Sequence, residues 1–150
     1  MAELASTDRL TGLKNRREFD RILGTIPRQP FAVLAIDVDH LKRVNDQFGH
    51  EAGDHILRVI GSELRSSLRG GDAAARIGGD EFALILHNGD GPVLGLLIAR
   101  MQASVANAVG MEVGFSAGLA TAPDETSDPG VMYRLADERL YEDKRAKVRS

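Results

Sequence analysis

A chain of 150 residues has the length of one ordinary domain, and 43% hydrophobic residues are enough to build a core. The net charge of −3 gives no overall attraction for nucleic acid, so we expect no nucleic-acid partner. Cysteine is absent, which excludes a disulfide framework and a thiolate metal site, and no stretch approaches the roughly 20 apolar residues of a membrane span.

The hydrophobic pattern predicts helices and strands that follow one another in a recognisable order. The chain begins with a helix over 3–23 that is interrupted near 11–13, and prolines at 27 and 30 precede the first strand. The predicted strands are 31–39, 73–77, 82–87 and 111–121. The other predicted helices are 41–47, 52–68, 93–109 and 131–147, with a turn at 87–92 and an exposed loop at 123–130. Strands separated by helices, together with one hairpin, favour an α+β fold with a mixed sheet and helices mainly on one face.

The first strand ends in two acids. Its sequence FAVLAIDVD is apolar almost throughout, which is typical of a central strand buried on both faces. Asp37 and Asp39 are two residues apart, so their side chains share a face, and Val38 points the other way. A carboxylate near the end of a buried strand is costly unless it is paired or bound to metal.

A second acidic segment, RIGGDEF, joins the second and third strands. Gly78 and Gly79 are typical of a hairpin turn, and glycine lets a backbone approach a ligand closely. Asp80 and Glu81 follow directly and point to opposite sides of a strand. Two strands that each end in acids predict a Mg²⁺ site for phosphoryl or nucleotidyl transfer. The alternative is a set of acids in surface salt bridges.

The chain resembles the GGDEF domain family, the diguanylate cyclases of bacteria. Any one of its five motifs could occur by chance, but together and in this order they are specific. The motifs are DRLTGLKNRREF (8–19), DVDHLKRVNDQFGHEAGDHIL (37–57), RGGD (69–72), RIGGDEF (76–82) and ADERLYEDK (136–144). In the first of them, we interpret Asp8 and Arg16-Arg17 mainly as structural support for the sheet. The resemblance covers nearly the whole chain and implies a single GGDEF domain over 1–150 with a palm-like, ferredoxin-related fold, as in class III nucleotidyl cyclases.

The resemblance also implies a reaction and its metal. Two GTP molecules would be joined into cyclic di-GMP, with release of two pyrophosphates, by a two-fold homodimer that needs Mg²⁺ or Mn²⁺. Asp37, the backbone carbonyl of Val38 and Asp80 would hold the metal, and Glu81 would act as a second ligand or in proton handling. We expect a cytoplasmic protein, or the cytoplasmic part of a larger signalling protein with a linked regulatory domain.

The same resemblance implies residues that bind the substrate. Lys42 and Lys144 would meet the triphosphate, and Asn45 and Asp54 would meet guanine, whose paired donors suit a carboxylate. Gly78, Gly79 and His50 would lie beside the nucleotide. The alternatives are a helix N-terminal acid for Asp54 and a turn histidine for His50. The chain departs from the family pattern where Lys147 and Val148 replace a usual glycine and arginine, and Arg145 or Arg149 are possible substitutes.

The motif Arg69-Gly70-Gly71-Asp72 matches the family's RxxD inhibitory site for the product. Arg100 matches in spacing a further arginine that helps to hold the product. The alternatives are a loop ion pair for the motif and a solvated side chain for Arg100. Three rival functions remain open at this point: a receptor for cyclic di-GMP or GTP without turnover, a related enzyme that accepts ATP, and a purely structural partner domain. Asp54 argues against an ATP enzyme.

Overall fold

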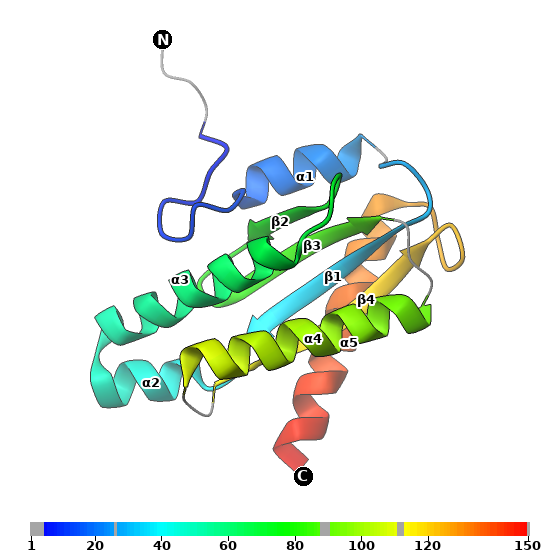
Figure 1. Ribbon diagram of the computed structural model, residues 1–150. Coiled ribbons are helices and arrows are strands. Elements are labelled where there is room, and N and C mark those ends of the chain that lie inside the picture. Colours follow the sequence, from blue (N-terminus) through cyan, green and yellow to red (C-terminus); the bar gives the residue numbers. More distant parts are fainter. Residues whose placement is uncertain (1–4, 26, 88–90, 111–112, 150) are drawn as a thin grey trace.

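The computed structural model describes residues 5–25, 27–87, 91–110 and 113–149. Its strands are β1 (Phe31–Val38), β2 (Ala73–Arg76), β3 (Glu81–His87) and β4 (Phe115–Ala122). Its helices are α1 (Arg16–Gly24), α2 (Leu41–Phe48), α3 (His50–Ser67), α4 (Gly91–Val109) and α5 (Pro129–Arg149). The four strands form one sheet in the order β2-β3-β1-β4, with helices on both faces (Figure 1).

All three strand pairings in this sheet are antiparallel, so the prediction of a mixed sheet was wrong. The physical reason lies in how the helices cross over. The connection through α2 and α3 carries the chain from β1 past the position of β3 to β2, and the connection through α4 carries it from β3 past β1 to β4. Each pair of strands joined by helices is therefore separated by one strand of opposite direction. This is the order of a ferredoxin-like β-α-β-β-α-β unit, as predicted.

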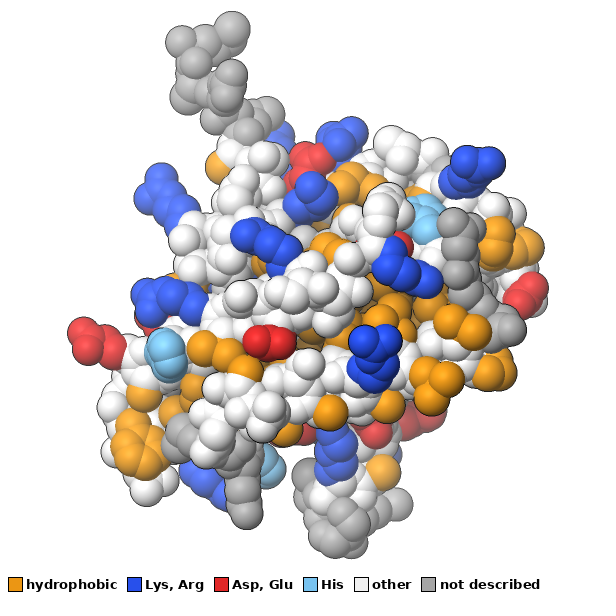
Figure 2. Space-filling view, viewed as in Figure 1, with side chains coloured by type: hydrophobic (Ala, Val, Ile, Leu, Met, Phe, Trp, Pro, Cys, Tyr) orange, Lys and Arg blue, Asp and Glu red, His pale blue; other side chains and the backbone are white. Residues whose placement is uncertain are grey.

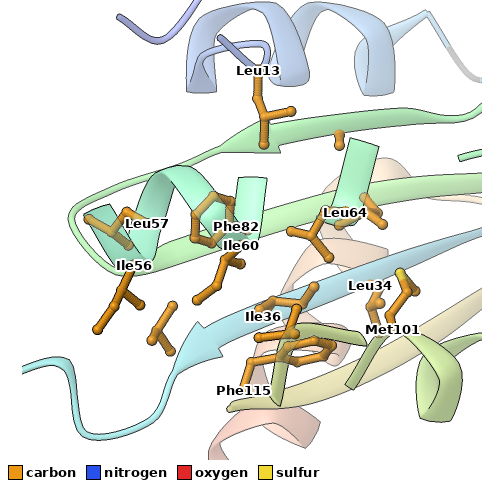
Figure 3. Packing of buried hydrophobic residues seen from close by; sticks show 14 of the residues in the cluster. Leu13, Leu34, Ile36, Ile56, Leu57, Ile60, Leu64, Phe82, Met101 and Phe115 are labelled. Atoms are coloured by element: carbon orange, nitrogen blue, oxygen red, sulfur yellow. The ribbon is translucent and has the colours of Figure 1, made fainter. Parts of the chain in front are cut away.

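The helices cover both faces, which corrects the prediction that they lie mainly on one. One core, shown in Figure 3, packs α2, α3 and α4 against the even-numbered residues of β1, among them Leu34 and Ile36. The other core packs α1 and α5 against the odd-numbered residues, among them Val33 and Ala35. Because both faces of β1 are buried, the apolar run predicted to be a central strand is one.

The segment before α1 is not helical over residues 5–15, so the predicted helix from residue 3 was wrong there; residues 3 and 4 lie outside the described part. A hydrogen-bonded turn takes its place. The Asp8 carboxylate accepts from the Thr11 backbone N–H at 2.9 Å and from its hydroxyl at 2.7 Å, and Gly12 has a φ of +74°. These side chain to backbone bonds compete with helix formation, and α1 begins only after Asn15 caps it by accepting from Glu18 N–H.

The remaining elements follow the predicted boundaries to within a few residues. Gly49, with a φ of +94°, separates α2 from α3, as predicted. Strand β4 begins at Phe115 rather than at 111, and residues 111–112 lie outside the described part, as do 88–90 of the predicted turn. By length and composition alone α4 could cross a membrane, but Leu94, Met101 and Val105 pack in the core.

Helix α4 also exposes apolar side chains on its outer side. Figure 2 shows hydrophobic side chains gathered over the first half of this helix, where Val93 is 47% exposed and Leu96 is 69% exposed. Lysine and arginine side chains are scattered over the rest of that face. The face therefore combines a local apolar area with a largely polar surface.

Candidate active site

The two acidic segments meet at one end of the sheet. Strand β1 ends beside the turn between β2 and β3, where the Val38 backbone N–H donates to the Asp80 carbonyl oxygen at 3.0 Å. Asp37 stands directly opposite Glu81 in the antiparallel register of β1 and β3. Sequence spacing could not show this convergence, because the two aspartates are 43 positions apart in the chain; the fold implied by the family resemblance did predict it.

The pKa of Asp37 is strongly shifted in this site. Burial raises its pKa to about 6; the Lys144 ammonium opposes that rise, and the facing Asp80 carboxyl group adds to it. The Lys144 Nζ atom of α5 lies 2.7 Å from Asp37 Oδ2, and the Asp37 side chain is only 19% exposed. The site therefore holds two neighbouring carboxyl groups with one close lysine, which leaves it short of positive charge.

The donor atoms at this point suit a hard divalent cation. Asp37 Oδ1 is buried and meets no hydrogen-bond donor within the described ranges. A buried carboxylate oxygen without a partner is costly, and a metal ligand would explain it. Over the described part of the chain, no group of three or more His, Cys, Asp and Glu side chains could hold a metal. The arrangement of these acids therefore leaves ligand positions to backbone, water or substrate, which is typical of Mg²⁺.

A second ion pair lies next to the first and was missed in the sequence. Lys147 Nζ is 3.0 Å from Asp39 Oδ2 and donates to the Phe115 carbonyl oxygen at 2.8 Å. The buried Ser116 hydroxyl donates to Asp39 Oδ1 at 2.7 Å. Asp37 and Asp39 thus share a face, as predicted, and α5 covers that face. The available signal was spacing. Asp37 and Asp39 lie on the same side of an extended segment, and Lys144 and Lys147 lie on the same side of a helix, so the two pairs can face each other.

The turn that carries Gly78 and Gly79 does not need glycine for its own conformation. Neither residue has a positive φ, and a Cβ atom on either would meet nothing within 4 Å. Arg76 holds this turn by donating to the Gly79 carbonyl oxygen at 2.8 Å and to Asp8 Oδ1 at 3.3 Å. Since the fold makes no demand for glycine here, approach of a ligand to the backbone is the better explanation.

A cavity of about 410 Å³ lies beside this turn. Its lining includes Arg16 and Arg17 from the start of α1, together with Arg76 and Gly78. Asp8 also lines it and binds both Thr11 and Arg76, which agrees with its interpretation as structural support.

The predicted nucleotide-binding residues of α2 and α3 lie at the junction of these two helices. Lys42 and Asn45 are on α2, and His50 and Asp54 are in the first turns of α3. The Asn45 amide oxygen is buried against Gly53, the residue before Asp54, and no donor meets it within the described ranges. Asn45 and the first turn of α3 are therefore brought together, while Lys42 and His50 are exposed.

The RxxD motif forms a bonded unit at the other end of β3. Arg69 Nε lies 3.2 Å from Asp72 Oδ2, and the backbone N–H of His87 donates to Asp72 Oδ1 at 2.8 Å. The Asp72 side chain is 1% exposed and the Arg69 side chain is 39% exposed, so the aspartate holds the arginine at the surface. His87 was not singled out in the sequence. Arg100 is exposed on α4. The motif and the acidic site are about 20 Å apart along β3.

Residues 5–150 match the family model described as "Diguanylate cyclase, GGDEF domain". Diguanylate cyclase DgcS of Shewanella oneidensis is 37% identical over 96% of this chain and 51% of its own length. The chain spans about half, or less, of the length of the curated relatives that it matches.

Solved structures agree with this match. A sensory box/GGDEF family protein from Caulobacter crescentus has a TM-score of 0.85 at 35% identity, over 95% of this chain and 99% of that chain. The GGDEF domain of DgcB from the same organism, solved in complex with c-di-GMP, has a TM-score of 0.83 at 28% identity, over 97% of this chain and 94% of that chain. The fold described above is therefore that of GGDEF domains, the palm-like cyclase fold that was predicted.

Proposed function

Because this chain belongs to the GGDEF family of diguanylate cyclases, we propose that it condenses two GTP molecules into cyclic di-GMP and releases two pyrophosphates. The 3′-hydroxyl of each GTP attacks the α-phosphate of the other, a new phosphodiester bond forms, and pyrophosphate leaves with the bonding electrons. The observation that carries this proposal is the convergence of Asp37 and Asp80 beside Lys144. Clustered acids at a strand end would have no evident use in a purely structural domain.

The metal site in this proposal consists of the Asp37 and Asp80 carboxylates and the Val38 carbonyl. A bound Mg²⁺ or Mn²⁺ would neutralise charge on the phosphate oxygens and favour deprotonation of the attacking hydroxyl. Glu81, opposite Asp37 in the register, either completes the ligand set or receives the hydroxyl proton. Lys144 turns from Asp37 to the triphosphate, because a metal held by Asp37 would take over the neutralisation of that carboxylate.

Substrate selection falls to the junction of α2 and α3. Asp54 accepts hydrogen bonds from the guanine donors and Asn45 makes a further contact, whereas adenine lacks that donor pair. Lys42 reaches the triphosphate, and His50, Gly78 and Gly79 line the nucleotide. Lys147 is held by Asp39 and the Phe115 carbonyl, so we assign it to anchoring α5 rather than to replacing the missing family arginine.

The proposal also includes inhibition of the enzyme by its product at the RxxD motif. Arg69 is exposed and has its guanidinium fixed by a buried aspartate, which prepares it for a guanine edge or a phosphate. The related DgcB domain was solved with c-di-GMP, which supports binding of the same ligand here. We assign Arg69 and Asp72 to this site, with Arg100 as its third residue. The proposed setting is the cytoplasm, in a homodimer linked to a regulatory domain.

The direct test is incubation with GTP and Mg²⁺, with cyclic di-GMP followed by chromatography. We expect product from the wild type, and a loss on the order of 10²–10³-fold in Asp80→Ala, because a charge-stabilising group is removed. Asp124→Ala, an exposed acid in the loop after β4, is the matched control and should keep full activity. The absence of product from folded wild type at high concentration would refute the cyclase proposal. Calorimetry with cyclic di-GMP would then distinguish a receptor, and competition between ATP and GTP would reveal an ATP enzyme.

A further inference from the structure

Gly53 lies in the first turn of α3 at a position where any other residue would push the Asn45 side chain aside. A Cβ atom on it would be 1.8 Å from the Asn45 amide oxygen and 2.8 Å from its Cγ atom, and the residue is buried. Its φ is not positive, so the backbone conformation itself would accept any residue. Glycine within a helix is less favourable than alanine. The fold accepts this cost to let the Asn45 side chain lie on α3.

The contact that Gly53 permits is itself unfavourable for the free protein. The Asn45 amide oxygen is buried, and within the described ranges it meets no hydrogen-bond donor. A buried acceptor without a donor destabilises the free protein. Two unfavourable features therefore coincide at one point, the place where helices α2 and α3 meet. Such a coincidence is expected where a ligand supplies what the protein lacks.

The ligand that fits is the guanine base, and this step rests on the proposed function. Asp54 follows Gly53 directly, so its carboxylate and the Asn45 amide oxygen border the same turn of α3. Guanine carries the N1–H and two hydrogens on its 2-amino group, which makes three donors for three acceptor oxygens. We infer that Gly53 is a positioning residue for base selection: by lacking a side chain, it holds the Asn45 amide oxygen where it accepts from the guanine 2-amino group.

The test is a double-mutant cycle read out by nucleotide binding rather than turnover. Calorimetry compares 3′-deoxy-GTP, which lacks the attacking hydroxyl, with 3′-deoxy-ITP, which also lacks the 2-amino group. We expect Gly53→Ala to weaken binding of the guanine nucleotide about tenfold, the scale of one hydrogen bond, and to leave the inosine nucleotide unchanged. Asn45→Ala should do the same, and the double variant should bind no more weakly than either single variant.

Stability measurements keep the test valid if Gly53→Ala folds poorly. The added methyl group clashes only with Asn45 among its nearest atoms, so the double variant should regain the melting temperature that Gly53→Ala loses. Gly95→Ala is the control, because a Cβ atom there meets nothing within 4 Å of its place on α4. Wild type that binds neither nucleotide would refute the proposed function. Either of two results would overturn this inference alone: a wild-type preference for guanine that survives in Gly53→Ala, or a further loss of guanine binding when Gly53→Ala is added to Asn45→Ala.

Discussion

Each of the two aspartates at the end of β1 meets its own lysine from α5. Lys144 pairs with Asp37 and Lys147 with Asp39, which fastens the last turns of the helix to the acidic end of the sheet. The two pairs differ in what surrounds them. Asp39 also accepts from Ser116 and is fully engaged, whereas Asp37 keeps one buried oxygen without a donor within the described ranges. At the residue scale, the acidic-site oxygen that still lacks a donor within the described ranges is therefore Asp37 Oδ1.

Arg69 provides a prediction that separates feedback from catalysis. Arg69→Ala should weaken inhibition by cyclic di-GMP on the order of tenfold to a hundredfold, because charged hydrogen bonds contribute about 1.5–3 kcal/mol. Turnover without added product should be unchanged, since the motif lies at the opposite end of β3 and Asp72 keeps its bond to His87 N–H. Initial rates across a product series measure this, with exposed Arg58→Ala on α3 as control. Equal inhibition in wild type and Arg69→Ala would remove the motif from the product site.

Glu125 provides a prediction about pH. Hydrogen bonding to Arg139 lowers the pKa of Glu125 to about 2, from an ordinary value of 4.5. A lowered carboxyl pKa stabilises the fold above the unfolded value and loses that effect as pH falls towards the folded value. Glu125→Gln should therefore reduce the free energy of unfolding at pH 7, by less than about 1 kcal/mol because both side chains are partly exposed. Urea unfolding followed by circular dichroism should show most of this difference gone by about pH 3. A difference independent of pH would contradict the assignment.

At the scale of elements, β4 and α5 approach each other so closely at Gly118 that no side chain would fit between them. A Cβ atom on Gly118 would be 2.1 Å from the Ala136 carbonyl oxygen and 2.2 Å from the Leu140 backbone nitrogen. This contact sets the height of α5 above the sheet, and through it the reach of Lys144 to Asp37. A glycine in a strand is therefore part of the geometry of the acidic site.

Gly118→Ala should destabilise the domain by about 1–3 kcal/mol, the usual cost of overpacking a core, because backbone atoms must move. It should also raise the KM for GTP, since α5 carries Lys144 away from the site. Urea unfolding measures the first effect and initial rates the second. Gly95→Ala in α4 adds the same methyl group in open space and should be neutral or slightly stabilising. A Gly118→Ala domain as stable as the wild type would show that the helix adjusts freely.

Most elements could be predicted from sequence because their apolar residues repeat with the period of a strand or a helix. The region 5–15 could not be predicted in this way, because individual hydrogen bonds rather than apolar periodicity determine its conformation. The Asp8 carboxylate accepts from the Thr11 backbone N–H, and Gly12 has a positive φ. Sequence patterns also fail to show which strands are neighbours, so the sheet was predicted as mixed. The acidic pair was predictable from strand ends together with the family fold. The Lys147–Asp39 bond joins residues 108 apart and had only a weak spacing signal.

At the scale of the whole molecule, one chain carries one set of the proposed site residues, whereas the proposed reaction consumes two GTP molecules that attack each other. Two chains must therefore face one another about a two-fold axis, with each nucleotide held by its own chain. Under this proposal, GTP binds to a single chain, whereas turnover needs two. The rate per chain then depends on how often two loaded chains meet, which makes protein concentration a direct probe of the mechanism.

We expect the rate of cyclic di-GMP formation per chain to rise with protein concentration and to level off once dimers dominate, as measured by chromatography alongside analytical ultracentrifugation. Fusion of a parallel two-stranded coiled coil to the N-terminus should bring the low-concentration rate up to that plateau. The coiled coil would hold two chains together, so the meeting of their two loaded domains would become intramolecular. The matched control is the same fusion with polar residues at the coiled-coil core positions, which should behave like the unfused chain. A constant rate per chain in samples that sediment as monomers would mean that one chain completes the reaction alone, and the two-fold arrangement would have to be abandoned.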